Sequence, residues 1–367
     1  MDYFFIMTGF LCAYTLVPKL VSQKIGIIPY LKIIKHRFFR VWPVLALSFL
    51  YWWQFAPQLF NGPLWFLYEY YANNCDKLWW SKIFLVENIT FYHTYDEDAN
   101  LCMMVTWYIA AEFQMYLVAV ITLIVYVKRR KIGFTLMIAL ICQSFALAIA
   151  NCLKYNFVYP ATNLNKYWYF FYINPYVRWY PLFIGVVWGL LYYEYSKLRK
   201  KNIFYFFEKK VVISYIIMAL GLALNIFVIL FPLYSWKDAL DDVWHPLRVL
   251  FNAIGITMIF MPLVSNRDFY LKRFMNLRIF QILGKTSFMT YLYHESWIFV
   301  LAYTNPAFKY DYSGLRLVWF VLKTFLCTQP IAFLAHLVFE KPLLGIEGHL
   351  TKKNPVAPKD KMKTATV

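Results

Sequence analysis

Ionisable residues inside long apolar stretches are the first candidates for chemistry in this chain of 367 residues. Glu112 lies about nine residues into one stretch, which at ~1.5 Å per helical residue would place its carboxylate roughly 13 Å deep in a membrane. His294 and Glu295 lie comparably deep in another stretch, and Arg178 and Arg248 enter two more. Because a charge in hydrocarbon is costly, each is a candidate functional residue; the alternative is a structural polar network between helices.

A buried carboxylate beside an imidazole can form a general base together with the group that orients it. The carboxylate fixes the tautomer of the imidazole and raises its basicity. We therefore interpret Glu112 and His294 as candidate catalytic residues. This interpretation requires a fold that brings their two distant stretches together.

Paired arginines indicate a different chemistry in residues 36–43, whose sequence is HRFFRVWP. Arg37 and Arg40 are three residues apart, so on a helix both guanidinium groups lie on one face and can clamp phosphate oxygens at a membrane surface. His36 precedes them directly. The alternative is that paired arginines simply mark the cytoplasmic end of a membrane span, as they commonly do.

The elements that must position these residues are long and apolar. Hydrophobic residues make up 61% of the chain, and about 20 apolar residues of helix cross a hydrocarbon core. We predict an all-α fold, a polytopic transmembrane helical bundle with about nine spans. The predicted spans are residues 3–18, 41–60, 103–127, 133–153, 178–196, 211–232, 246–265, 280–303 and 315–338.

The basic residues predict how the spans are oriented. Most of the 37 Lys and Arg lie in alternate segments, which the positive-inside rule assigns to the cytoplasm. These segments are residues 17–40, 128–131, 197–210, 266–285 and the tail from Lys341. The opposite, lumenal or extracellular side holds the loop 61–102 with the acidic residues 96–98 and the sequon 88–90, so we predict a glycan on Asn88. The membrane would be that of the endoplasmic reticulum or the plasma membrane.

Charge and cysteine content favour some classes of protein over others. The formal charge of +18 is explained by the excess of Lys and Arg in the predicted cytoplasmic segments, so it does not indicate a nucleic-acid-binding protein. Residues 1–350 are predicted to form the transmembrane domain, and residues 351–367 a disordered basic cytoplasmic tail that would favour anionic lipid. A disulfide between Cys75 and Cys102 is plausible in the predicted lumenal loop. No Cys and His have the spacing of zinc ligands, so we expect no metal.

Several short segments are informative as an ordered set. Residues 2–11 are similar to a D-x-FF-x-x-SG-F/L-L helix, and residues 37–43 to an R-x-x-R-x-x-P element. A WW, Cys and TWYLANDMQ block is similar to Trp79, Trp80, Cys102 and residues 106–114, with Glu112 in place of Asp. A KPW-x-R-x-x-PY-x-x-G-x-x-x-G helix is similar to residues 174–189, with Asn174 in place of Lys. Residues 287–294 are similar to T-Y-x-x-YL-x-H, and residues 340–342 to E-x-P. Over nearly its whole length the chain thus resembles the acyltransferase 3 family of integral membrane acyltransferases, in the animal branch named for "nose resistant to fluoxetine".

The resemblance implies transfer of an acyl group from a thioester donor, acyl-CoA, to a hydroxyl-type acceptor that is a lipid or a small molecule. It implies that Arg37 and Arg40, with His36, bind the phosphates of CoA. The residues that would line the cavity, as substrate-binding or proton-transfer groups, are Glu112, His294, Arg178, Asp2 and Gln114. Acyl-CoA would be a co-substrate, and we expect no bound cofactor.

The chain departs from the family pattern at its start. The family usually has ten spans and begins with one that carries a His thought to be the catalytic base, whereas this sequence begins at the family's second span. We therefore expect weak or no turnover, with His294 as the remaining deeply intramembrane His. The alternative function is that of a noncatalytic lipid or small-molecule transporter, or of a truncated pseudoenzyme of the same family.

Overall fold

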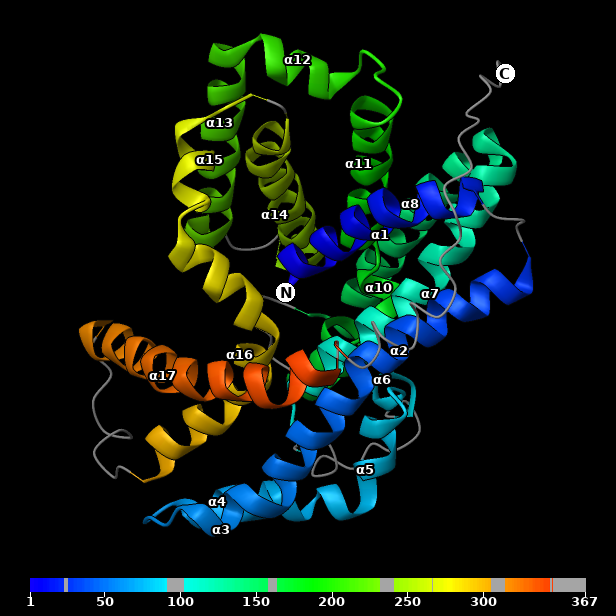
Figure 1. Ribbon diagram of the computed structural model, residues 1–367. Helices are drawn as coiled ribbons and strands as arrows, with labels where there is room; N and C mark the ends of the chain where they lie inside the picture. The colour runs from blue at the N-terminus through cyan, green and yellow to red at the C-terminus, as the bar shows by residue number, and fades with distance from the viewer. Residues whose placement is uncertain are drawn as a thin grey trace.

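The structure is a computed structural model, which describes residues 1–22, 26–90, 102–157, 164–231, 241–265, 267–304, 314–343 and 345. Every regular element in these residues is a helix, and none of these residues forms a strand (Figure 1). The predicted all-α fold class is therefore confirmed. The predicted tail 351–367 and the acidic residues 96–98 lie outside the described residues.

The helices form an upper and a lower group in Figure 1. The upper group consists of α1 (Asp2–Ser22), α7 (Thr106–Lys128), α8 (Arg130–Tyr155), α9 (Leu164–Tyr167), α10 (Pro175–Arg178), α11 (Tyr180–Ser196), α12 (Ile203–Lys209), α13 (Val211–Leu230), α14 (Asp241–Val264) and α15 (Tyr270–Met275). The lower group consists of α2 (Ile27–Leu50), α3 (Ala56–Leu59), α4 (Trp65–Asn73), α5 (Cys75–Ile83), α6 (Glu87–Thr90), α16 (Arg278–Tyr303) and α17 (Gly314–Ala335). A π-helical segment, Tyr51–Phe55, joins α2 to α3, another, Trp168–Tyr172, follows α9, and a third, His336–Glu340, continues α17.

Six helices in the described part of the chain are long and apolar enough to cross a membrane, namely α1, α7, α8, α13, α14 and α17. Each overlaps most of one predicted span, and α1 and α8 contain theirs completely. The other three predicted spans, 41–60, 178–196 and 280–303, fall on α2, α11 and α16. Helix α11 has only 17 residues, and α2 and α16 include charged residues. Helix α2 begins at Ile27 rather than at residue 41, because the basic residues before position 41 are helical as well.

Helix α1 lies against α11 with almost no space between the two backbones. A Cβ atom added to Gly9 would lie 2.0 Å from the carbonyl oxygen of Leu182, and one added to Gly185 would lie 2.0 Å from that of Ile6. Only glycine permits this approach, and small residues are typical where membrane helices pack closely. The contact fixes the N-terminal half of α1, which contributes residues to the site described below.

The lower group has an aromatic core. Trp52, Trp65 and Tyr68 are buried together, with the rings of Trp65 and Tyr68 stacked at a centroid distance of 4.7 Å. Helices α16 and α17 form a hairpin that extends sideways from this core (Figure 1). Much of α17 is exposed and apolar; Leu315, for example, is 84% exposed. Such a surface is expected to face lipid.

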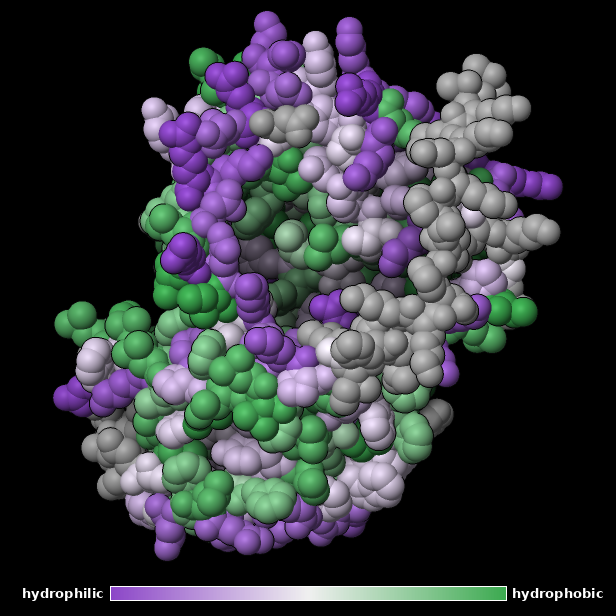
Figure 2. Space-filling model, viewed as in Figure 1, coloured by the Kyte–Doolittle hydropathy of each residue, from purple (hydrophilic) through white to green (hydrophobic). Residues whose placement is uncertain are grey.

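The surface polarity varies from one end of the molecule to the other. In Figure 2 hydrophilic side chains gather at the top of the view and along its bottom edge, and a further hydrophilic band runs from the top to the middle beside broad hydrophobic areas. The top carries α12, from the basic segment 197–210, and the bottom carries α4 and α5, from the loop 61–102 (Figure 1). These two segments were predicted to lie on opposite sides of the membrane, and they lie at opposite ends of the molecule.

Candidate functional site

Three cavities follow one another between α1, α2, α7, α16 and α17. The outer cavity, of about 390 Å³, is lined by Thr8, Leu11, Cys12, Thr15, Arg37, Arg40, Val41, Tyr116, Phe288 and Glu340. The inner cavity, of about 190 Å³, is lined by Phe4, Thr8, Arg37, Val41, Tyr108, Ile109, Glu112, Ser287, Phe288 and Tyr291. The α16–α17 groove, of about 450 Å³, is lined by Phe4, Leu283, Ser287, Thr290, Tyr291, His294, Ile298, Phe320, Val321, Thr324, Phe325, Thr328 and Gln329.

Shared walls connect these cavities in series. The outer and inner cavities have Thr8, Arg37, Val41 and Phe288 in common. The inner cavity and the α16–α17 groove have Phe4, Ser287 and Tyr291 in common. The three cavities are therefore neighbours. The outer one is lined by Arg40 and Glu340, the inner one by Glu112, and the mainly apolar groove by His294. Their lining residues come from both ends of the sequence and from its middle.

The outer cavity brings the two predicted phosphate-binding arginines together. Arg37 and Arg40 both line it, as expected for residues three apart on α2. Arg40 is exposed, whereas Arg37 is half-buried. His36 is exposed on α2 and is not among the lining residues of the three cavities. The structure therefore places Arg40 at the mouth, Arg37 deeper and His36 outside.

Arg37 is not a simple phosphate ligand, because an acidic partner already neutralises its charge. Its guanidinium group donates to the Glu112 carboxylate and forms a salt bridge with it, and it lies 4.1 Å from the ring centroid of Tyr116. The pair joins α2 to α7 at the wall between the outer and inner cavities. Both arginines of the predicted phosphate site line the outer cavity, Arg40 as an exposed cation and Arg37 as a cation shared with Glu112.

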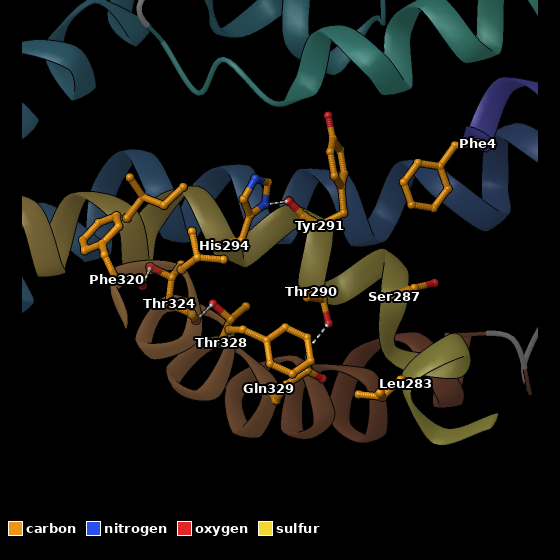
Figure 3. A pocket seen from close by; sticks show the side chains of 13 residues that line it. Phe4, Leu283, Ser287, Thr290, Tyr291, His294, Phe320, Thr324, Thr328 and Gln329 are labelled. Carbon is orange, nitrogen blue, oxygen red and sulfur yellow. Dashed lines mark hydrogen bonds between the residues drawn. The ribbon is translucent and has the colours of Figure 1, made fainter. Parts of the chain in front are cut away.

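His294 lies in the α16–α17 groove with its tautomer defined by the backbone. Its Nδ1 lies 2.6 Å from the carbonyl oxygen of Tyr291 (Figure 3). A carbonyl oxygen only accepts hydrogen bonds, so Nδ1 carries the proton and Nε2 keeps its lone pair. Thr324, Thr328 and Gln329 approach the same groove from α17 (Figure 3). Nε2 is therefore the basic atom that the groove offers.

Glu112 and His294 do not form the predicted contact pair. Glu112 lines the inner cavity and is paired with Arg37, whereas His294 lines the groove. Tyr291 stands between them as part of both cavity walls, and its hydroxyl donates to the carbonyl oxygen of Val105. The carboxylate thus does not orient the imidazole, because the Tyr291 backbone does so instead.

Three further predicted residues have structural roles. Asp2 and Arg178 are both buried and form a salt bridge between α1 and α10, with the Arg178 guanidinium 5.2 Å from the ring centroid of Tyr172. The Gln114 side-chain amide donates to the carbonyl oxygen of Leu85 at 2.8 Å. These contacts fasten helices to one another, and none of the three residues lines the three cavities. The structure therefore does not place them in the site.

Parts of the predicted loop 61–102 are enclosed between the helices. Asn88 is 1% exposed, and its Nδ2, the atom to which a glycan would be attached, donates to the carbonyl oxygens of Ile173 at 2.7 Å and Trp107 at 3.2 Å. This burial argues against the predicted glycan, because the attachment atom is enclosed in the fold. Cys75 and Cys102 are joined by a disulfide.

Sequence reasoning missed the polar side chains that α17 directs into the groove. Thr324 and Thr328 are four residues apart and therefore lie on one helical face, with Gln329 beside them. Gln329 Nε2 donates to Thr290 Oγ1 across the hairpin at 3.2 Å. The i, i+4 spacing of two threonines in an apolar helix was the available signal. In the described residues no group of three or more His, Cys, Asp and Glu side chains could hold a metal ion.

Comparisons with known proteins match this chain over most of its length. A family model described as an acyltransferase domain matches residues 1–337. The nose resistant to fluoxetine protein 6 of Caenorhabditis elegans is 23% identical over 374 aligned residues. The alignment covers 94% of this chain and 44% of the relative, so the chain spans less than half the length of that relative. No solved structure matches the chain.

Proposed function

The chain belongs to the acyltransferase 3 family, and from this premise we propose that it transfers an acyl group from acyl-CoA to the hydroxyl group of a membrane-embedded acceptor. The observation that carries the proposal is the series of three neighbouring cavities, which has Arg37, Arg40 and Glu340 in the wall of the outer one and a mainly apolar lining in the groove at the other end. Acyl-CoA has a polyanionic head and an apolar tail, so its change in polarity from one end to the other matches that of the three cavities. Acceptor and donor then approach from opposite ends.

The donor binds at the outer cavity. The CoA phosphates are strong acceptors for guanidinium groups, and Arg40 is the exposed cation at the mouth. Arg37 lies one step deeper and is held by Glu112. An arriving phosphate competes with that carboxylate for Arg37, so donor binding loosens the wall between the outer and inner cavities. The thioester then reaches the inner cavity beside Tyr108 and Tyr291.

The acceptor enters through the α16–α17 groove. The groove is mainly apolar, but Thr290, His294 and Gln329 contribute polar atoms in its wall. Its position in a hairpin with an exposed apolar surface suits an amphiphile that arrives from the bilayer. A lipid or a comparably apolar small molecule with one hydroxyl group fits this description.

His294 acts as the general base. Nε2 takes the proton of the acceptor hydroxyl as its oxygen attacks the thioester carbonyl carbon, forming a C–O bond. The C–S bond then breaks, and the departing thiolate of CoA takes the proton back from the imidazole. The Tyr291 carbonyl supports the imidazolium that forms between these steps, because Nδ1–H donates to it.

The experiment is a labelled acyl-CoA assay with the protein in membranes and a membrane-lipid extract as acceptor. Positioned general-base catalysis contributes about 10²- to 10⁴-fold, so His294→Ala should lower turnover by that factor and leave donor binding unchanged. Gln281→Ala is the matched control, because Gln281 lies on the same helix, is exposed and lines none of the three cavities. Arg40→Gln should instead raise the donor KM by about tenfold or more.

Three outcomes would each contradict a part of the proposal. Equal turnover of His294→Ala and the control would remove the base from the mechanism. Binding of labelled lipid without any acyl transfer, in the parent chain and all variants, would favour the noncatalytic transporter. Unchanged donor binding in Arg40→Gln would leave that arginine as an ordinary topology signal.

A further inference from the structure

We propose that the junction of α7, α8 and α11 contains a binding site for the headgroup of an anionic phospholipid. A cavity of about 600 Å³ opens there, and it shares no lining residue with the three cavities of the site. Its lining includes Tyr126, Arg130 and Lys131 at one end and Phe134, Leu190 and Leu191 at the other. The cavity thus has a cationic rim and an apolar floor, and the proposal is independent of the proposed acyl transfer.

The cations at the rim outnumber the acidic groups that face them. Glu194 is the buried carboxylate of the cavity. It pairs with Arg130, accepts from the Tyr126 hydroxyl at 3.2 Å, and lies 4.0 Å from Lys200 Nζ. One carboxylate therefore faces Arg130 and Lys200, and Lys131 also lines the cavity. The surplus positive charge favours an anion.

Arg130 can hold Glu194 and a phosphate together. Its guanidinium group has five N–H donors in a planar fork, and it donates to the Glu194 carboxylate through Nη2. The side chain is 57% exposed, so the remaining donors are open to a ligand. Glu194 thus positions the guanidinium group at the rim, which lowers the conformational entropy that phosphate binding would cost.

The height of the cavity matches the headgroup region of a bilayer. Helices α7 and α8 both qualify as membrane spans, and they meet at residues 128–130, so this junction marks a membrane boundary. Phe134 lies one helical turn deeper than Arg130. Because the basic segment 128–131 predicts the cytoplasmic side, the cavity would face the leaflet that carries anionic lipids. Basic pockets between membrane helices on that side are typical sites for such headgroups.

The same phosphate chemistry could come from a soluble source, and the apolar floor distinguishes the two. Inorganic phosphate or CoA would use only the rim. A phospholipid uses the rim for its phosphate and the floor of Phe134, Leu190 and Leu191 for the start of its acyl chains. The lipid is therefore the occupant to which both parts of the cavity are suited.

The test titrates the purified full chain in detergent with dioleoylphosphatidylserine and counts bound lipid by native mass spectrometry. Replacing both Arg130 and Lys131 with Gln should weaken binding about tenfold to a hundredfold, the effect of losing a charge-assisted hydrogen bond. Replacing Lys128 and Arg129 with Gln is the matched control, because these residues are exposed, lie in the same connection and do not line the cavity. That control should leave binding within about twofold of the parent, because neither side chain contributes a hydrogen bond to the phosphate.

An equal loss of lipid binding in the two double variants would show nonspecific attraction and overturn the proposal. Unchanged lipid binding in both double variants would also overturn it. Equal binding of dioleoylphosphatidylcholine would overturn the charge requirement. Displacement of the lipid by inorganic phosphate or CoA at similar concentrations would overturn the assignment to a lipid. If replacing Arg130 releases Glu194 and prevents folding, the single variant Lys131→Gln takes the place of the double variant in the lipid titration. Lys131 lines the cavity without pairing with Glu194.

Discussion

At the residue scale, the Arg37–Glu112 pair is the feature whose loss has the clearest consequence. The side chains are 26% and 9% exposed, so removing either one leaves a poorly solvated charge. Arg37→Leu and Glu112→Leu should each lower the free energy of unfolding by about 3 to 5 kcal/mol. The double variant should cost less than the sum of the two, because no charge is left behind.

A double-mutant cycle measured by unfolding in mixed micelles checks this prediction. The Arg37→Leu, Arg40→Leu pair is the control cycle, because Arg40 is exposed and the two cations do not form an ion pair. Additive losses in the Arg37–Glu112 cycle would mean that the two charges are not coupled. The proposed loosening of the cavity wall by donor phosphates would then lose its basis.

Asn88 provides a second prediction at this scale. Its amide donates two hydrogen bonds to backbone carbonyls in a buried position. Asn88→Ala should therefore lower the free energy of unfolding by about 1 to 3 kcal/mol, because two buried acceptors lose their donor. Glycosidase treatment of the parent chain should leave its electrophoretic mobility unchanged. A mobility shift that disappears in the variant would restore the glycan predicted from the sequence.

At the element scale, the packing of α1 on α11 determines the shape of the inner cavity. Helix α1 contributes Phe4 and Thr8 to the cavity walls, and the backbone contact at Gly185 holds it in place. A Cβ atom at Gly185 would lie 2.0 Å from the Ile6 carbonyl oxygen. Gly185→Ala should therefore cost about 1 to 3 kcal/mol of stability by forcing the helices apart.

Gly284→Ala is the matched control for this prediction. A Cβ atom there meets no other atom within 4 Å, and the residue lies inside α16. Alanine in an open helical position should stabilise the protein by about 0.5 to 1 kcal/mol. Thermal unfolding of the two variants should therefore move in opposite directions. Movement in the same direction would show that the α1–α11 contact tolerates a side chain.

At the scale of the whole molecule, the disulfide connects the loop 61–90 to the start of α7. Cys75 and Cys102 are separated by 27 residues. Replacing both with Ser should lower the free energy of unfolding by about 2 to 4 kcal/mol, the typical contribution of a disulfide that closes a loop. Cys142→Ser is the control, because Cys142 is an exposed free cysteine. Cys75 and Cys102 are buried, so a cysteine introduced at the exposed Lys77 in the Cys142→Ser background is the labelling probe. A membrane-impermeant maleimide should reach this probe only from the lumenal or extracellular side.

Labelling of the cysteine at position 77 from the cytoplasm would contradict the predicted orientation. It would also move the basic mouth at Arg40 to the wrong side for a cytoplasmic donor. The orientation and the proposed donor route are therefore tested together by one labelling experiment.

The sequence by itself determined the features that depend on local composition and spacing. Apolar stretches long enough to cross a bilayer predict the positions of the nine long helices, but not the start of α2 or the short helices such as α4 to α6. Arg37 and Arg40 face one cavity because they are three residues apart on a helix. The ordered motifs also indicated the family before any fold was known. Each of these depends on residues that are close together in the chain, or on their order along it.

Only the tertiary structure decided which of the polar residues meet. Asp2 pairs with Arg178, Arg37 pairs with Glu112, and Tyr291 separates Glu112 from His294. The burial of Asn88 was equally invisible in the sequence. In a membrane helix both the lipid-facing and the protein-facing positions are apolar, so the periodicity that locates a soluble core is weak. Which polar side chains find partners therefore depends on which helices pack together, and close approaches such as Gly9 and Gly185 set that packing.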